Sequence, residues 1–117
     1  MPIKNFLDIQ PVEAVCHNGE GKIKIVNIFD KEDLAAPLKF VHYTVLPPRT
    51  SIGLHTHKND QEMYILLEGE GIMEIDGEKT AVKKGDVILN KPFGTHALYN
   101  TSDNYEIKIL VMEVVIE

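Results

Sequence analysis

The sequence has little cysteine and no long hydrophobic run. Cys16 is the single cysteine, so no intrachain disulfide can form. The longest apolar runs, such as YILL at residues 64–67, are far too short to cross a bilayer as a helix. The first residues, MPIKNFLDIQ, do not contain the apolar segment of a signal peptide. Together these absences predict a soluble, reduced protein of the cytoplasm.

Positive charge is also scarce. Twelve lysine and arginine residues face eighteen aspartate and glutamate residues, which gives a net charge of −6. Nucleic acids and anionic membranes bind to basic patches, so this balance argues against both as partners. The remaining composition is that of an ordinary globular protein, with 44% hydrophobic residues in a chain of 117. This length is typical of one domain, and we expect residues 1–117 to form one.

Short strands separated by turns dominate the chain. β-branched and aromatic residues fill these segments, and Asp76-Gly77 is a favoured two-residue hairpin turn. The expected strands are residues 22–29, 39–46, 53–57, 62–68, 72–75, 79–82, 87–89, 95–99 and 105–116. Many short strands with closely spaced turns predict an all-β sandwich or barrel.

The segment 62–68 is apolar on both faces. Tyr64 and Leu66 share the face of Glu62, because side chains of a strand alternate, and the apolar residues between them point the other way. The segment 107–116 has the same character. In a small barrel the outer face must then be covered by the N-terminal segment or by a second subunit. We therefore expect a homodimer.

The stretch GLHTHKNDQE, residues 53–62, carries the main chemical signal. His55 and His57 lie on one face of a strand, so both imidazoles can reach one ion. A turn at residues 58–60 starts a new strand and lets Glu62 lie beside the pair, while His96 arrives from a distant strand. Three imidazoles and a carboxylate suit a divalent first-row metal. On a six-coordinate ion they would leave two positions open for a ligand.

This pattern resembles the first motif of the cupins. That motif is a glycine, a His-x-His pair, a glutamate three or four residues later, and a glycine after six more. Here His55 and His57 are followed by four residues, Glu62, six residues and Gly69. The leading glycine is the departure, because Arg49 occupies its place.

The second cupin motif is Gly, five residues, Pro-x-Gly, two residues, His, three residues, Asn. The chain has Gly85, Pro92, Gly94, His96 and Asn100 in this order. The separation of Gly85 and His96 is eleven positions, as in the family, whereas Pro92 and Gly94 are each displaced by one. The displacement affects the shape of the loop and not the register of the histidine.

The resemblance implies a double-stranded β-helix, the jelly-roll barrel of the cupins. It also implies one divalent metal ion per chain, of a kind that the sequence does not specify (Fe, Mn, Ni, Zn or Cu). The expected ligands are His55, His57, Glu62 and His96.

Further residues are candidates for the pocket around the metal. Those that share the strand faces of the ligands are Tyr64, Leu66, Leu98 and Asn100, and Phe93 is a candidate wall or lid residue. Arg49 could hold a substrate carboxylate, although a surface arginine in a turn is the simpler interpretation. His42 is expected to be packed in an apolar strand, and His17 to be exposed in a turn.

The sequence leaves two classes of function open, both with a small-molecule ligand. One is a metal-dependent enzyme. No second acid or base is evident beside Glu62, so dioxygenase-like oxidation is favoured over decarboxylation or isomerisation, which require a further proton donor. The alternative is a non-catalytic binding or sensor module that uses the same metal site.

Overall fold

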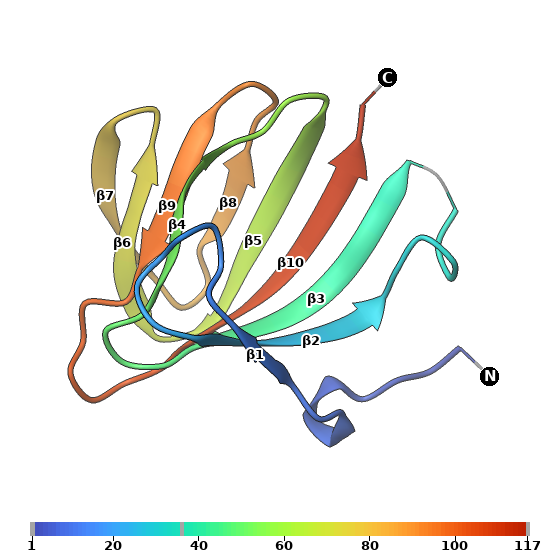
Figure 1. Cartoon of the computed structure of the whole chain (residues 1–117), viewed down its shortest axis with the longest axis horizontal. Coiled ribbons are helices and arrows are strands. Elements are labelled where there is room, and N and C mark those ends of the chain that lie inside the picture. Colours follow the sequence, from blue (N-terminus) through green and yellow to red (C-terminus); the bar gives the residue numbers. More distant parts are fainter. Residues whose placement is uncertain (1, 36, 117) are drawn as a thin grey trace.

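The computed structural model describes residues 2–35 and 37–116, which are almost entirely antiparallel strands (Figure 1). A short 3-10 turn, η1, spans Phe6–Asp8. The strands are β1 Val12–Ala14, β2 Ile23–Phe29, β3 Leu38–Leu46, β4 Ser51–Thr56, β5 Asp60–Glu68, β6 Glu70–Ile75, β7 Glu78–Lys83, β8 Val87–Asn90, β9 Thr95–Tyr99 and β10 Ile107–Val115. The expected all-β class is confirmed, and the hairpin across Asp76-Gly77 forms between β6 and β7.

The strands form two sheets. One has the order β1-β2-β3-β10-β5-β8 and the other the order β4-β9-β6-β7. The pairing of β3 with β10 and of β4 with β9 brings together segments that are far apart in the sequence. This arrangement is the double-stranded β-helix that the sequence predicts.

Alternation along the strands separates the barrel interior from its outer face. In β5, Glu62, Tyr64 and Leu66 are buried, whereas the residues between them are only partly buried. The interior is filled by Ile23, Leu46, Ile52, Tyr64, Leu66, Met73, Val82, Ile88, Leu98, Ile107, Ile109 and Val111. This packing adjoins the polar cluster described below, because Tyr64 lies next to His96.

The N-terminal segment covers part of the outer face. The ring of Phe6 lies 4.3 Å from the ring of Tyr43, centroid to centroid. Phe6 and Ile9 pack on a second apolar cluster formed by Val26, Ile28, Tyr43 and Val45. Neither η1 nor β1 was predicted from the sequence, because residues 2–14 show no alternation long enough to indicate a strand.

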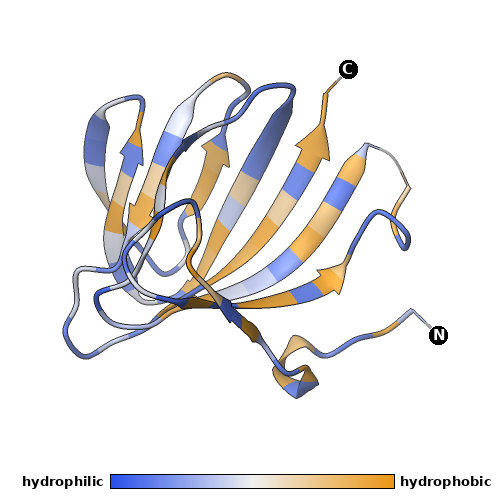
Figure 2. Ribbon diagram, in the orientation of Figure 1, coloured by the Kyte–Doolittle hydropathy of each residue, from blue (hydrophilic) through white to orange (hydrophobic). Residues whose placement is uncertain are grey.

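The outer face remains exposed over β8 and partly exposed over β5. Val87 is 60% exposed and Leu89 44% exposed, although both are apolar. Figure 2 shows that β8 and β10 are hydrophobic along most of their length, so side chains on both faces contribute. The N-terminal segment thus accounts for only one part of the expected cover.

Two of the four register shifts among the described strands lie near the polar cluster. Between the pairs Ile52–Leu98 and His55–His96, β4 advances three residues while β9 advances two. The extra residue shifts the alternation, so that His55 faces inward like Ile52. A second irregularity lies where β3 meets the end of β10 and leaves Lys39 without a partner in the register.

Candidate metal centre

Four side chains converge at the open end of the barrel. His55 comes from β4, His57 follows that strand directly, Glu62 comes from β5 and His96 from β9. One potential ligand atom from each of these residues lies within 4.8 Å of the others. The cluster joins the two sheets, because β4 and β9 belong to one and β5 to the other.

The donor atoms are close together and largely shielded from water. Nε2 of His57 lies 3.2 Å from Nε2 of His96. Oε1 of Glu62 lies 3.3 Å from each of these nitrogens. It is buried, yet it has no hydrogen bond of acceptable geometry to any described residue. A buried carboxylate oxygen without such a bond, facing imidazole nitrogens, fits a metal ion bound among them.

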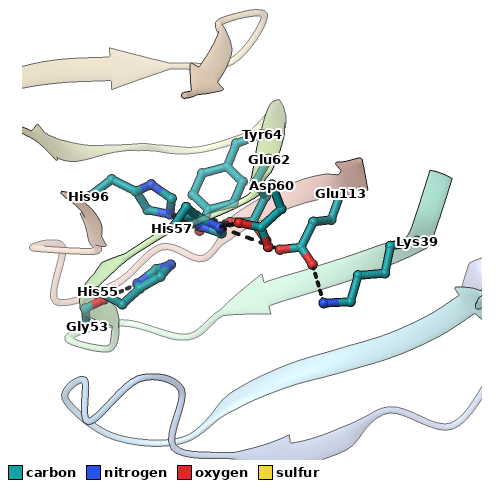
Figure 3. A network of polar contacts seen from close by, with 9 residues as sticks. All are labelled: Lys39, Gly53, His55, His57, Asp60, Glu62, Tyr64, His96 and Glu113. Carbon is teal, nitrogen blue, oxygen red and sulfur yellow. Dashed lines mark hydrogen bonds and ion pairs between the residues drawn. The ribbon is translucent and has the colours of Figure 1, made fainter. Parts of the chain in front are cut away.

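Neighbouring groups orient two of the rings (Figure 3). Nδ1 of His55 lies 2.7 Å from the backbone oxygen of Gly53, which can only accept, so Nδ1 is the donor. Nδ1 of His57 lies 3.0 Å from Oδ1 of Asp60. Both contacts leave Nε2 to face the cluster, as a ligating histidine requires.

The electrostatics of the cluster favour a cation. Burial would raise the pKa of Glu62, but the imidazoles of His57 and His96 outweigh it and lower the pKa to about 2. Burial lowers the pKa of His55 to about 4, so this ring is neutral and its Nε2 carries a free lone pair. The carboxylate of Glu62, assisted by Asp60, raises the pKa of His57 to about 9. In the metal-free site the positive charge therefore resides on His57.

A second carboxyl group lies behind His57. Oε1 of Glu113 is 3.7 Å from Nδ1 of His57, and its Oε2 is 3.0 Å from Nζ of Lys39. Burial raises the pKa of Glu113, although the ammonium of Lys39 opposes the shift. The bulge in β3 leaves Lys39 out of the register, next to Phe40, the residue that pairs with Glu113. Figure 3 shows this chain of polar groups leading from the histidines to Lys39.

Buried polar groups also flank the ligands deeper in the barrel. The hydroxyl group of Tyr64 lies 3.5 Å from Nε2 of His96. Burial raises the pKa of Tyr64 well above its usual value, so the phenol keeps its proton. Asn90 pairs with Glu62 across β8 and β5 and is 2% exposed. Neither its amide oxygen nor its amide nitrogen has a hydrogen-bond partner among residues 2–35 and 37–116.

A cavity of about 590 Å³ opens beside the cluster. Its volume suits a small molecule. It is lined by His17, Lys39, Phe40, His55, Thr56, His57, Lys58, Asn59, Asp60, Glu62, Glu113 and Val115. Three of the four expected ligands line it, and His96 lies deeper, with 1% of its surface exposed.

The other pocket candidates do not line this cavity. Tyr64, Leu66 and Leu98 belong to the buried core beneath it. Asn100 donates to the backbone oxygens of Leu46, Pro47 and Tyr105, and so holds loops together.

The two remaining candidates are exposed. Phe93 lies in the loop between β8 and β9 and is 72% exposed. Nε of Arg49 lies 2.6 Å from Oδ1 of Asp103, and the Arg49 side chain is 63% exposed. Arg49 thus lies at the surface, as its simpler interpretation from the sequence expected. His42 stacks on Phe40 with ring centroids 3.9 Å apart, as expected of a packed residue rather than a fifth ligand.

Sequence reasoning did not assign Asp60, Lys39, Glu113 or Asn90 to the site. Asp60 follows His57 by three positions, and this spacing was the one signal that could have shown it. Glu113 lies on the same face of its strand as Ile107, Ile109 and Val111. Only the pairing of β10 with β5 brings it opposite Glu62. Lys39 reaches the site through a bulge in β3, and no sequence pattern indicates this bulge.

An antiparallel double-stranded β-helix with three histidines and a glutamate at its mouth is a metal-binding barrel of the cupin type. The chain belongs to the cupin family, because the cupin domain family matches residues 42–113. The sequence-based assignment to this family is thereby confirmed.

Known proteins resemble the chain over most of its length. It is 29% identical, over 84% of its residues and 80% of the relative, to a protein of Thermotoga maritima named oxalate-binding protein. A crystal structure from T. maritima, described as that of a predicted oxalate decarboxylase, matches with a TM-score of 0.93 and 26% identity, covering 97% of this chain and 99% of that one. A polyketide cyclase of Streptomyces resistomycificus matches with a TM-score of 0.81 at 15% identity, covering 100% of this chain and 80% of the cyclase, and shares the fold alone.

These relatives give no support to the expected preference for dioxygenase-like oxidation, since both T. maritima names refer to oxalate. In the described part of the chain, no helix has the length and apolar character needed to span a membrane.

Proposed function

We propose that the chain holds one divalent metal ion through His55, His57, Glu62 and His96 and binds a small carboxylate of the oxalate class on it. The observation that carries the proposal is the convergence of these four donors within 4.8 Å beside a cavity of about 590 Å³. A bound ion would supply Lewis acidity and open coordination positions for carboxylate oxygens. The donor set suits Fe, Mn, Ni, Zn or Cu.

The charges around the cavity favour an anionic ligand once a metal is bound. Lys39 and Lys58 line the cavity together with the carboxyl groups of Asp60, Glu62 and Glu113. A divalent ion together with the two lysines outweighs the three carboxylates, so the loaded site attracts a small anion. The name of the T. maritima relative, oxalate-binding protein, supports the same ligand class.

Decarboxylation of that ligand is the second candidate. It would split hydrogen oxalate into carbon dioxide and formate, which requires a proton at the carbon that loses carbon dioxide. Glu113 lines the cavity and is a carboxyl group outside the proposed ligand set, so it could provide the proton donor that the sequence did not reveal. The similar T. maritima structure, that of a predicted oxalate decarboxylase, favours the same reaction.

Metal content and ligand binding test these proposals in sequence. Untagged protein and its His96→Ala variant are analysed for metal by mass spectrometry, and we expect about one divalent ion per chain in the parent and a loss in the variant. Calorimetry then compares oxalate with acetate on metal-loaded and metal-free protein. Oxalate binding confined to the loaded protein would support the proposal. If no metal binds to the parent, even after reconstitution, the proposed site is wrong.

Incubation with oxalate separates binding from catalysis. Formate detected by nuclear magnetic resonance, and abolished by Glu113→Gln, would establish the decarboxylase. Binding of oxalate without formate would leave a carboxylate-binding protein. Uptake of metal with no affinity for oxalate would keep the metal site and reject the ligand class.

We also propose that residues 1–117 form one cupin domain, which assembles as a homodimer in the cytoplasm. β1 and β2 lie outside the matched residues 42–113, yet they extend the same sheet, which supports a single domain. The exposed apolar face over β5 and β8 supports a second copy. The single cysteine supports a reducing compartment. Burial raises the pKa of Cys16 to about 11, so its thiol stays protonated and unreactive.

A further inference from the structure

The loop between β1 and β2 is fixed onto β4 beside the proposed ligands. Figure 1 shows this loop, residues 15–22, lying across β4. The backbone nitrogen of Gly53 donates to the oxygen of Cys16 at 3.0 Å, and the nitrogen of Ser51 donates to the oxygen of Glu20 at 2.9 Å. Oγ of Ser51 accepts from the nitrogen of Glu20 at 2.8 Å. These bonds attach both ends of the turn to the strand that carries His55.

Two glycines permit this close approach. A Cβ at Gly53 would collide with the backbone oxygen of His17, and one at Gly19 would collide with the backbone oxygen of Ser51. The turn itself places His17 and Asn18 at φ angles of 50° and 56°. Two left-handed residues closed by the hydrogen bond from Gly19 to Cys16 have the pattern of a type I′ turn. The backbone of this turn therefore fixes the direction of the Cα–Cβ bond of His17.

The side chain of His17 lies on the face of His55. The two rings are nearly parallel, with centroids 3.6 Å apart and an angle of 10° between their planes. His55 is the least buried of the four proposed ligands, and its Nδ1 hydrogen bond to Gly53 still permits the ring to rock about that bond. A ring stacked on its face opposes this movement.

His17 cannot be a fifth ligand to the same ion in this arrangement. The lone pair of an imidazole nitrogen lies in the plane of its ring, and bonds from nitrogen to such metals are about 2.0–2.1 Å long. An ion bound in the plane of His55 would lie more than this distance from the parallel plane of His17, whose centroid is 3.6 Å away. His17 lines the cavity, but it does so as a neighbour of a ligand.

We propose that His17 is a positioning residue of the metal centre, which holds the ring of His55 in the plane where Nε2 faces the other donors. The proposal rests on the metal site proposed above and adds to it a residue outside the ligand set. Without the stack, His55 would have to be ordered when the metal binds, so the affinity for metal would fall.

Two substitutions at His17 separate the ring from its nitrogens. Asn accepts left-handed backbone angles readily, so His17→Asn removes the ring while preserving the turn. His17→Phe keeps a flat ring and removes the nitrogens. His42→Asn is the matched control, because His42 also stacks on a ring, that of Phe40, but contacts no proposed ligand through it. Thermal melts of the metal-free proteins establish that each variant is folded.

Cobalt(II) is the probe, with affinity measured against a competing chelator and geometry followed by visible absorption. We expect His17→Asn to weaken Co(II) binding by about three- to tenfold and to broaden the absorption bands. We expect His17→Phe and His42→Asn to bind within about twofold of the parent.

Equal affinity and spectra for folded His17→Asn and the parent would overturn the positioning role while leaving the metal site intact. A loss in His17→Phe as large as in His17→Asn, at a melting temperature equal to that of the parent, would also overturn it, because the ring would then not be the cause. If the parent itself bound no metal, the metal site would fail first and His17 would have no ligand to position.

Discussion

Nδ1 of His57 lies 3.0 Å from Oδ1 of Asp60, the first residue of the strand that supplies Glu62. The turn that separates the two proposed ligands therefore also provides the carboxylate that orients one of them. A carboxylate on Nδ1 fixes the ring and makes Nε2 a stronger donor to a metal. The short segment from His55 to Glu62 thus contains three of the proposed ligands and a residue that orients one of them.

Replacement of Asp60 should weaken metal binding without removing a ligand. We expect Asp60→Ala to lower the affinity by about tenfold or more, and Asp60→Asn to have a smaller effect because its amide oxygen can still accept from Nδ1. Competition with a chelator measures both. Asp103→Ala is the control, since Asp103 forms an exposed pair with Arg49. Unchanged affinity in Asp60→Ala would show that this contact does not support the site.

The metal-free protein should be most stable near pH 6.5. The pKa of His57 is raised from 6.5 to about 9, so the folded state retains a proton that the unfolded state loses, and stability falls as the pH rises through this window. The pKa of His55 is lowered from 6.5 to about 4, so acid protonates the unfolded state first and stability falls below pH 6.5. Urea midpoints at pH 5, 6.5 and 8.5 test this.

Two comparisons separate His57 from other titrating groups. In His57→Gln the fall in stability between pH 6.5 and 8.5 should largely disappear. In metal-loaded protein it should disappear as well, because the metal replaces the proton on Nε2. A metal-free parent whose stability continued to rise up to pH 8.5 would contradict the charge assigned to His57.

The sequence indicated the proposed ligands because their signal is local and periodic. His55 and His57 are two positions apart, and the four residues between His57 and Glu62 are a recognisable turn. The glycine and proline pattern placed His96 in the same family motif. Alternation in β5 also predicted that Glu62, Tyr64 and Leu66 share the inner face.

Features that depend on tertiary pairing could not be predicted in the same way. Lys39 reaches the cavity only through a bulge, and Glu113 through the pairing of β10 with β5. His17 was expected to be exposed in a turn, and it is, but no pattern placed that turn on β4. Leu98 and Asn100 were assigned to the pocket because they share the strand face of His96. In the structure Leu98 belongs to the core, and Asn100 binds the backbone of a loop.

Lys39 should contribute to binding of the anionic ligand. Its ammonium lines the cavity and pairs with Glu113 at 3.0 Å. We expect Lys39→Met to weaken oxalate binding to the metal-loaded protein by about three- to tenfold, with little change in metal affinity. Lys108→Met is the matched control, because Lys108 forms a 3.0 Å pair with Glu68 that is outside this cavity. Equal losses in both variants would indicate a general effect of charge instead of a contact.

Asn90 should lower the stability of the metal-free fold. Its amide is buried beside Glu62 and lacks hydrogen-bond partners within the described residues, and a buried polar group in this state destabilises a protein. We expect Asn90→Leu to raise the free energy of unfolding by about 1–2 kcal/mol in urea titrations. Asn100→Leu should lower it by about 2–3 kcal/mol, because Asn100 holds three backbone oxygens. Destabilisation by Asn90→Leu would show that its amide is satisfied in solution.

The exposed apolar face of the larger sheet should form the homodimer. The register aligns two rows of outward side chains across four strands: Val41, Met112, Met63 and Leu89, and Tyr43, Leu110, Ile65 and Val87. The N-terminal segment packs near Val41 and Tyr43, so the exposed part lies over β8 and extends to the partly exposed residues of β5. A contiguous apolar surface of this kind is typical of an interface.

A single lysine at the edge of this face tests the dimer. We expect Val87→Lys to give a monomer of 13.2 kDa in sedimentation analysis, where the parent gives twice that mass. Val12→Lys is the matched control, because Val12 is 67% exposed and Val87 60% exposed, but Val12 lies on β1 at the opposite edge of the sheet. A dimer that persists in Val87→Lys, or dissociates equally in both variants, would place the interface elsewhere. A monomeric parent would show that this apolar face has no second copy as its cover.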